Sequence, residues 1–107
     1  MPRRLVLLGS DEIALPAFAA ARALPDTEVV AVYTQPDRPA GRGQEVRPNP
    51  VAAWAKAAGL PLRQPEKLGP EDATQLAALG ADLGVVMAYG QLLKTDFLAA
   101  TRQGFVN

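Results

Sequence analysis

The chain has 107 residues, and its eleven basic and eleven acidic side chains cancel to a net charge of zero at pH 7. Global charge therefore predicts neither a nucleic-acid nor a membrane partner, and any such partner has to meet a local patch. Cysteine and histidine are absent, which excludes disulfides, thiolate metal sites and a cysteine nucleophile and removes the commonest general base. We predict no metal site.

Apolar runs are short throughout the chain. None approaches the roughly 20 residues that span a bilayer, and the run over residues 5–8 ends at Gly9, too early for a signal peptide. A chain of this length forms one small domain or part of a larger one. We expect a cytoplasmic protein with no membrane partner.

The first third of the chain predicts a strand, a helix and a second strand. Residues 5–8 are a continuous apolar run, typical of a strand covered on both faces. Ser10 or Asp11 can cap a following helix, and residues 29–33 form the second apolar run. The apolar residues of the helix fall roughly on one face: Ile13, Leu15, Phe18, Ala19 and Leu24. Gly9 stands alone at the first turn, without a G-x-G-x-x-G pattern, so we interpret it as a tight turn that needs room.

Residues 34–50 contain four prolines, two glycines and three arginines, with almost no apolar side chain. Proline fixes φ and removes a donor, and glycine adds backbone freedom, so we predict a long loop without helix or strand. A loop of this length is usually either functional or disordered. The glycines at 41 and 43 predict a flexible, cationic tip.

The remainder of the chain alternates helices and strands. Asn49 is expected to cap a helix that begins at Pro50 and ends at Gly59. Residues 60–63 contain a proline and predict a short strand at the edge of a sheet. Four further elements follow: a helix over 70–79, an apolar strand over 83–87, a short helix over 95–100 and a strand that begins near 104.

This alternation predicts an α/β fold: a Rossmann-like, open, mainly parallel sheet with helices on both faces. If the strand order is 3-2-1-4-5, the order reverses between the first and fourth strands. Ligands of open α/β sheets bind beyond the carboxyl ends of the strands at such a point. Residues 9–12, residues 88–93 and Asn107 should therefore converge there, with the loop 34–50 over them.

Three segments carry a family resemblance. They are residues 33–43, which read YTQPDRPAGRG, residues 85–90, which read VVMAYG, and residues 104–107, which read GFVN. Together, in this order and spacing, they resemble the methionyl-tRNA formyltransferase family. The resemblance implies the formyltransferase fold, truncated at the fifth strand, with residues 1–107 as the N-terminal portion of the catalytic domain.

The resemblance also implies an activity, the transfer of formyl from 10-formyltetrahydrofolate to the methionine amino group of initiator methionyl-tRNA. Asn107 matches an asparagine of the family's active centre, whose side-chain NH₂ would donate to the formyl oxygen as charge develops there. The family's catalytic histidine and aspartate would lie beyond this chain, as would its tRNA-binding domain. We therefore predict no transfer by the 107 residues alone, and a monomer for the full-length enzyme.

The resemblance assigns folate binding to one continuous segment: Met87, Ala88, Tyr89, Gly90, Gln91, Leu92 and Leu93. It places the turn on the substrate side at Gly9, Ser10 and Asp11. At that turn the family usually has G-T-P-x-F, whereas this chain reads GSDEI, so the geometry of the turn is expected to differ.

The resemblance assigns contacts with tRNA to Arg38, Arg42 and Arg47. The family often has lysines directly after Gly43, but this chain has glutamine and glutamate there. The loop 34–50 therefore holds three arginines against one aspartate and one glutamate. We expect a weaker attraction to phosphate and a flatter dependence on salt.

Two other hypotheses stay open. One keeps the folate chemistry but uses a small-molecule acceptor (a sugar nucleotide, glycinamide ribonucleotide or water), against which the arginine loop argues. The other is a stand-alone Rossmann-like nucleotide-binding module. The single glycine at the first turn and the lack of an acidic residue at the end of the second strand (residues 33–35) argue against a dinucleotide. A sheet that ends on a newly begun strand leaves apolar surface uncovered, so we expect a fragment of a longer protein or self-association at that edge.

Overall fold

The computed structural model describes residues 2–40, 43 and 45–107, and within them five strands form one parallel sheet. The strands are β1 (Arg3–Leu8), β2 (Thr27–Tyr33), β5 (Leu62–Arg63), β6 (Leu83–Val86) and β7 (Phe105–Val106). Their order across the sheet is β5-β2-β1-β6-β7, and each neighbouring pair is parallel. The predicted order, with its reversal between the first and fourth strands, is confirmed.

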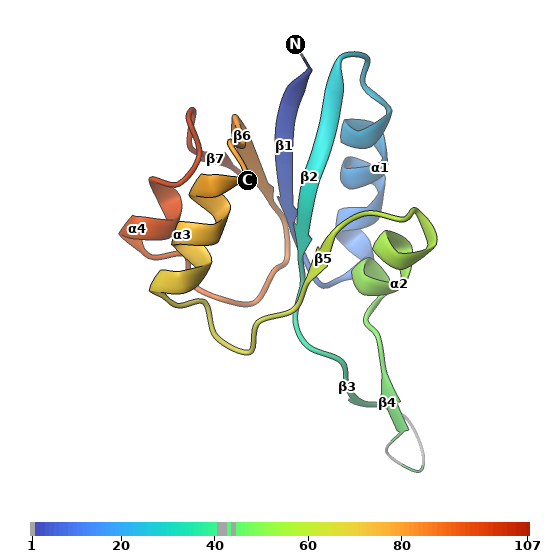
Figure 1. Cartoon of the computed structure of the whole chain (residues 1–107). Coiled ribbons are helices and arrows are strands. Elements are labelled where there is room, and N and C mark those ends of the chain that lie inside the picture. The colour runs from blue at the N-terminus through green and yellow to red at the C-terminus, as the bar shows by residue number, and fades with distance from the viewer. Residues whose placement is uncertain (1, 41–42, 44) are drawn as a thin grey trace.

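Helices cover both faces of the sheet (Figure 1). On one face lie α1 (Leu15–Ala23), which follows the short 3-10 turn η1 (Glu12–Ala14), and α2 (Pro50–Ala57). On the other face lie α3 (Pro70–Ala78) and α4 (Thr95–Leu98). Asp11 caps η1 and Asn49 caps α2, each through a side-chain oxygen that accepts a backbone N–H. Among the described residues, no helix has the length and apolar character needed to cross a bilayer.

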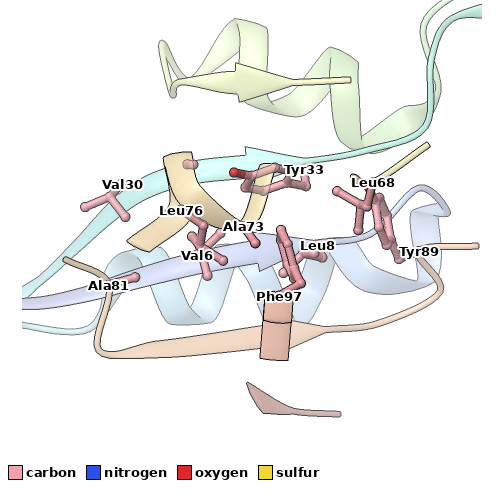
Figure 2. Close-up of a cluster of buried hydrophobic side chains, with 11 residues drawn as sticks. Val6, Leu8, Val30, Tyr33, Leu68, Ala73, Leu76, Ala81, Tyr89 and Phe97 are labelled. Atoms are coloured by element: carbon pink, nitrogen blue, oxygen red, sulfur yellow. The ribbon is translucent and has the colours of Figure 1, made fainter. Parts of the chain in front are cut away.

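Two buried clusters flank the sheet, because successive residues of β1 and β2 point to opposite faces. Leu7 and Val32 pack with Phe18 of α1 on one side. Leu8 and Tyr33 pack on the other side with side chains of α3 and α4 (Figure 2). The uninterrupted apolar runs are therefore strands covered on both faces, as predicted.

The predicted apolar face of the first helix is partly wrong. Phe18 is buried, but Ala19 and Leu24 are exposed and Ile13 keeps 65% of its surface accessible. The chain enters the helix through η1, whose three residues per turn shift the phase of the pattern. Ala14 is buried at this entry instead of Ile13.

The segment 34–50 also differs from the prediction, because it contains two strands. β3 (Arg38–Ala40) and β4 (Glu45–Arg47) form an antiparallel hairpin separate from the main sheet. Pro39 lies opposite Val46, and a two-stranded ribbon tolerates proline where its nitrogen faces a free edge. The hairpin extends away from the edge of the sheet at which β1 and β2 end (Figure 1). Two of the three residues of the predicted flexible tip, 41 and 42, lie outside the described residues, as does residue 44.

Candidate functional site

The exits of β1, β2 and β6 meet at the carboxyl edge of the sheet. Gly9 N donates to the Tyr33 carbonyl at 3.0 Å, and Ser10 N donates to the Ala88 carbonyl at 2.8 Å. The turn after β1 is therefore bonded to the exits of both neighbouring strands. A Cβ at Gly9 would lie 2.6 Å from the Met87 carbonyl oxygen, so close packing of backbone requires glycine here, in agreement with its interpretation as a tight turn.

The Ser10 side chain adds further bonds between these exits. Its hydroxyl donates to the Tyr89 carbonyl at 2.9 Å, accepts from Gln35 N at 3.0 Å and lies 3.3 Å from Thr34 Oγ1. Asp11 is exposed, and its carboxylate accepts a backbone N–H at the start of η1. In the turn predicted to face substrate, both polar side chains are thus engaged within the protein.

The turn after β6 has an unusual backbone. Ala88 and Gly90 have positive φ values of 51° and 93°, a region that residues with a Cβ rarely adopt. A Cβ at Gly90 would also lie 2.8 Å from Gln35 Nε2. Tyr89 is 2% exposed and belongs to the core cluster of Figure 2, whereas Leu92 is 80% exposed. The Tyr89 ring therefore anchors the turn from below, and the turn presents backbone and Leu92 outward.

The two buried phenols near this turn are neutral. Burial raises the pKa of Tyr89, and the Asp72 carboxylate and Tyr33 raise it further. Burial also raises the pKa of Tyr33, and the neighbouring Arg63 guanidinium opposes this rise. Both phenols stay protonated at neutral pH, so neither serves as a general base there.

Gln91 bonds the same turn to two other segments. Its Nε2 donates to Gln35 Oε1 and to the Pro65 carbonyl, both at 3.0 Å, and its Oε1 accepts from Leu68 N at 2.9 Å. Both donors of the amide are used, together with one lone pair of its oxygen. A side chain predicted to bind ligand therefore holds three segments of the protein together.

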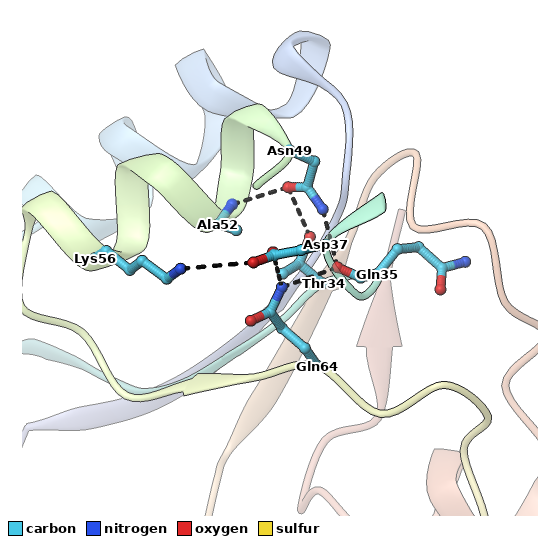
Figure 3. Close-up of polar contacts among 7 residues, drawn as sticks. All are labelled: Thr34, Gln35, Asp37, Asn49, Ala52, Lys56 and Gln64. Carbon is cyan, nitrogen blue, oxygen red and sulfur yellow. Dashed lines mark hydrogen bonds and ion pairs between the residues drawn. The ribbon is translucent and has the colours of Figure 1, made fainter. Parts of the chain in front are cut away.

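The base of the hairpin is tied to the body by a second set of polar contacts (Figure 3). Asn49 Nδ2 and Gln64 Nε2 both donate to the Gln35 carbonyl at 3.1 Å. Gln64 Nε2 also donates to Asp37 Oδ1 at 2.8 Å, and the Asp37 carboxylate lies 3.9 Å from Lys56 Nζ. These contacts fix where the hairpin leaves the sheet.

A groove of about 490 Å³ opens beside the turn after β6. It is lined by Gln35, Arg38, Glu66, Lys67, Leu68, Gly90, Gln91, Leu92 and Lys94. Its volume lies within the range of roughly 300–1,000 Å³ that is typical of small-molecule sites. Three basic side chains against one acidic one, with two leucines, suit a ligand that has both an apolar part and a negative charge.

A larger groove of about 770 Å³ lies at the opposite edge, where the strands begin. The Asp82 carboxylate in this groove is already engaged within the protein, since Arg102 Nε lies 3.8 Å from it and the backbone N–H of Arg4 donates to it at 2.8 Å. Ligands of open parallel sheets bind at the carboxyl ends of strands. We therefore take the smaller groove as the candidate site.

Asn107 emerges on the same edge as this groove. β7 is parallel to β6, with Val106 opposite Val85, so Asn107 follows beside the exit of β6. A Cβ at Gly84 would overlap the Phe105 ring, and the glycine therefore lets this ring pack against β6. The Asn107 side chain is exposed.

Two of the three arginines assigned to tRNA lie in the described hairpin. Arg38 and Arg47 are exposed and face each other across the ribbon. Arg38 also lines the candidate groove, whereas Arg47 Nη2 lies 3.3 Å from the Glu45 carboxylate. Arg42 lies outside the described residues.

Several polar residues of this region were missed by the sequence analysis. Gln35 and Gln64 each follow the end of a strand by one or two residues, and that position is a usable signal in a parallel sheet. Lys67 and Lys94 line the groove from irregular segments. No local pattern marks them, because their approach depends on the path of the folded chain.

The motifs and geometry agree with comparisons to known proteins. The sequence profile of the formyl transferase family matches residues 4–107. The chain is 48% identical over 109 residues to a methionyl-tRNA formyltransferase of Halorhodospira halophila, and 49% identical over 105 residues to one of Xanthomonas axonopodis pv. citri. These matches cover 100% and 97% of this chain but only 34% of each relative.

Among solved structures, a phosphoribosylglycinamide formyltransferase from Bacillus halodurans matches with a TM-score of 0.66 and 19% identity. The match covers 96% of this chain and 54% of that protein, and it supports a shared fold. Because the family profile extends over all but the first three residues, the chain belongs to the formyl transferase family.

Proposed function

We propose that the chain supplies the amino-terminal third of a methionyl-tRNA formyltransferase, with 10-formyltetrahydrofolate as donor and initiator methionyl-tRNA as acceptor. Membership of the formyl transferase family supports a folate-derived formyl donor. Relatives with 46–49% identity that bear the name methionyl-tRNA formyltransferase support the acceptor. The observation that carries the proposal is the groove at the carboxyl edge, where the turn 88–93 meets the exits of β1 and β2.

The donor would bind along residues 87–93, against the candidate groove. Leu68 and Leu92 supply apolar surface for a flat ring, and Lys67 and Lys94 supply positive charge for carboxylates. A folate carries both kinds of group, so the lining of the groove fits this class of ligand. The buried Tyr89 contributes by holding the turn and not by contact through its ring.

Asn107 would contribute to the chemistry itself. Its amide NH₂ can donate a hydrogen bond to an oxygen on which negative charge develops, and a donor in this role is worth about 3 kcal/mol of transition-state stabilisation. The residues that would move the proton of the attacking amine are a histidine and an aspartate implied by the family resemblance. This chain has no histidine, so we expect the 107 residues alone to bind and not to transfer.

The hairpin would meet the acceptor. Arg38 and Arg47 are exposed on a ribbon that extends from the edge of the site (Figure 1), and Arg42 joins them by sequence. Planar guanidinium groups suit phosphates and unstacked bases, as found at the end of a tRNA. Such an acceptor implies a cytoplasmic role in translation initiation.

A chimera tests the proposal directly. Residues 1–107 would replace the matching part of the Halorhodospira halophila relative, which is 48% identical over this region. We expect the chimera to formylate charged initiator tRNA and the 107 residues alone to show no transfer. A folded chimera that binds the formyl donor and leaves methionyl-tRNA unmodified would overturn the proposed acceptor.

A variant of the same chimera tests the role of Asn107. We expect Asn107→Ala to lower kcat about 100-fold, because the loss falls on the transition state, with little change in donor affinity. Gln103→Ala is the matched control, since it removes an exposed amide at the other edge of the sheet. Equal losses in kcat and in donor affinity would contradict the role assigned to Asn107.

A further inference from the structure

The hydroxyl of Ser10 has little capacity left for a substrate. A serine hydroxyl has one proton to donate and two lone pairs. The proton is directed to the Tyr89 carbonyl, one lone pair accepts Gln35 N, and the other faces Thr34 Oγ1. A substrate that accepts a hydrogen bond would have to displace the bond to Tyr89. One that donates would have to enter beside Thr34, which is fully buried and gives its own proton to Asn49 Oδ1 at 2.9 Å. The side chain therefore acts within the protein, even though it lies in the turn first assigned to the substrate side.

Ser10 holds a part of the backbone that needs support. Two successive carbonyls, those of Ala88 and Tyr89, are bonded to its N–H and its hydroxyl at 2.8 and 2.9 Å. Ala88 has a φ of 51°, a conformation that persists only where the surroundings impose it. In a trans peptide the N–H points away from the C=O, so fixing these carbonyls also fixes the next two amides, which face away from Ser10.

Those two amides belong to Tyr89 and Gly90. Within the described part of the chain, neither donates to another backbone group. Gly90 and Gln35 both line the candidate groove. The Gln35 N–H also donates to the Ser10 hydroxyl. One hydroxyl thus sets the orientation of two walls of the groove.

We propose that Ser10 is a positioning residue for the formyl donor: its hydroxyl sets the turn 88–90 and the start of the hairpin in the orientation that binds, without touching the donor. The identity of the ligand rests on the proposed function. The effect of the hydroxyl on the turn rests on the hydrogen bonds alone.

The test uses the whole 107-residue chain and two measurements on each variant. NMR gives amide exchange rates, and titration with 5-formyltetrahydrofolate, a stable isomer of the donor, gives a dissociation constant. We expect Ser10→Ala to speed exchange of the Gln35 amide, to shift the signals of residues 88–90 and to raise the dissociation constant about tenfold. Ser10→Thr keeps the hydroxyl and should restore most of the affinity.

Thr27→Val is the matched control, because Thr27 Oγ1 donates to the Leu24 carbonyl at 2.6 Å at the opposite edge of the sheet. It should lower the melting temperature as Ser10→Ala does and leave the dissociation constant unchanged. The same affinity loss in both variants, or unaltered exchange at Gln35 in Ser10→Ala, would overturn the positioning role. If the unmodified chain binds no 5-formyltetrahydrofolate, the proposed function fails, and the effect of Ser10 on the turn is judged by NMR alone.

Discussion

The strand-exit cluster (Gly9, Ser10, Thr34, Gln35 and Gln91) and the β3–β4 hairpin leave the same edge of the sheet but are held differently. In the cluster, polar side chains bond across three strand exits, and Thr34 is fully buried. In the hairpin, the described strands pair with each other, and even Val46 is 64% exposed. The first region is fixed by the body of the protein, and the second is fixed only at its base.

This contrast matches the two kinds of partner in the proposed function. A small ligand binds best to a site that is already ordered, because little entropy is then lost on binding. A two-stranded ribbon is at best marginally stable by itself, and a large partner such as tRNA can supply the contacts that order it. We infer that the donor side is formed in advance, whereas the acceptor side is adaptable.

The largest effect is expected from adding a methyl group at Gly9. The Cβ of Gly9→Ala would lie 2.6 Å from the Met87 carbonyl, and backbone cannot move aside cheaply, so we expect a loss of about 3 kcal/mol in unfolding free energy. Gly43→Ala is the counterpart in the hairpin. Among the described residues its Cβ would meet nothing within 4 Å, and only its φ of 82° is strained, so global stability should change by less than about 0.5 kcal/mol. Urea unfolding measures both; equal losses would remove the contrast.

The next effect is expected at the junction of the two regions. Asn49 Oδ1 accepts from Ala52 N at 2.8 Å as a helix cap, and Asn49 Nδ2 donates to the Gln35 carbonyl at 3.1 Å. Asn49→Ala removes both, together with the bond that Asn49 Oδ1 accepts from Thr34 Oγ1 at 2.9 Å, and should cost about 1.5 kcal/mol in urea unfolding. Asn49→Asp keeps the cap and should lose less than half as much. If the two variants lose the same amount, the bond to Gln35 is the main contribution and the cap is minor.

A smaller effect, visible at high pH, is expected from the anchor beneath the turn. The raised pKa of Tyr89 in the folded state means that the unfolded chain loses this proton first. The free energy of unfolding therefore keeps its full value below about pH 10 and declines above that pH. Tyr89→Phe should reduce this decline. At pH 8 it should be neutral or up to about 1 kcal/mol stabilising, because the hydroxyl has no hydrogen-bond partner among the described residues.

Urea unfolding of the Tyr89→Phe variant and the unmodified chain at pH 8 and pH 11 makes this comparison. Tyr33 also has a raised pKa, so part of the decline should persist in the variant. An identical decline in both proteins would show that the Tyr89 phenol does not titrate with unfolding.

The arrangement of the sheet could be predicted because its rules act on whole segments. Uninterrupted apolar runs mark strands buried on both faces, and the right-handed connection between parallel strands limits their order. These two rules alone predict that residues 9–12 lie next to residue 88. The hairpin could not be predicted in this way, because Pro39 argues locally against a strand and pairing with residues 45–47 depends on the ribbon as a whole.

Side-chain roles at the site were harder to predict than its position. Tyr89 and Gln91 lie in the segment assigned to folate, but the first is buried in the core and the second bonds three segments of the protein. Such roles depend on contacts between residues far apart in the chain. A motif marks where backbone must follow a given path, and it does not distinguish a residue that touches ligand from one that shapes the turn.

The smallest effect on stability, and the sharpest test of the hairpin, is expected from Glu45→Gln. The Glu45–Arg47 pair is exposed, with side chains 72% and 61% accessible, so its loss should change unfolding free energy by about 0.3 kcal/mol or less. The variant frees Arg47 and makes the ribbon more positive, so in the chimera the affinity for tRNA should rise severalfold at low salt and converge with the parent at high salt. Glu28→Gln is the matched control, because it frees Arg4 from an exposed pair of 3.9 Å outside the hairpin. If both variants bind tRNA equally well, the attraction of tRNA depends on the total charge of the protein. That result would contradict the assignment of the hairpin to the acceptor side.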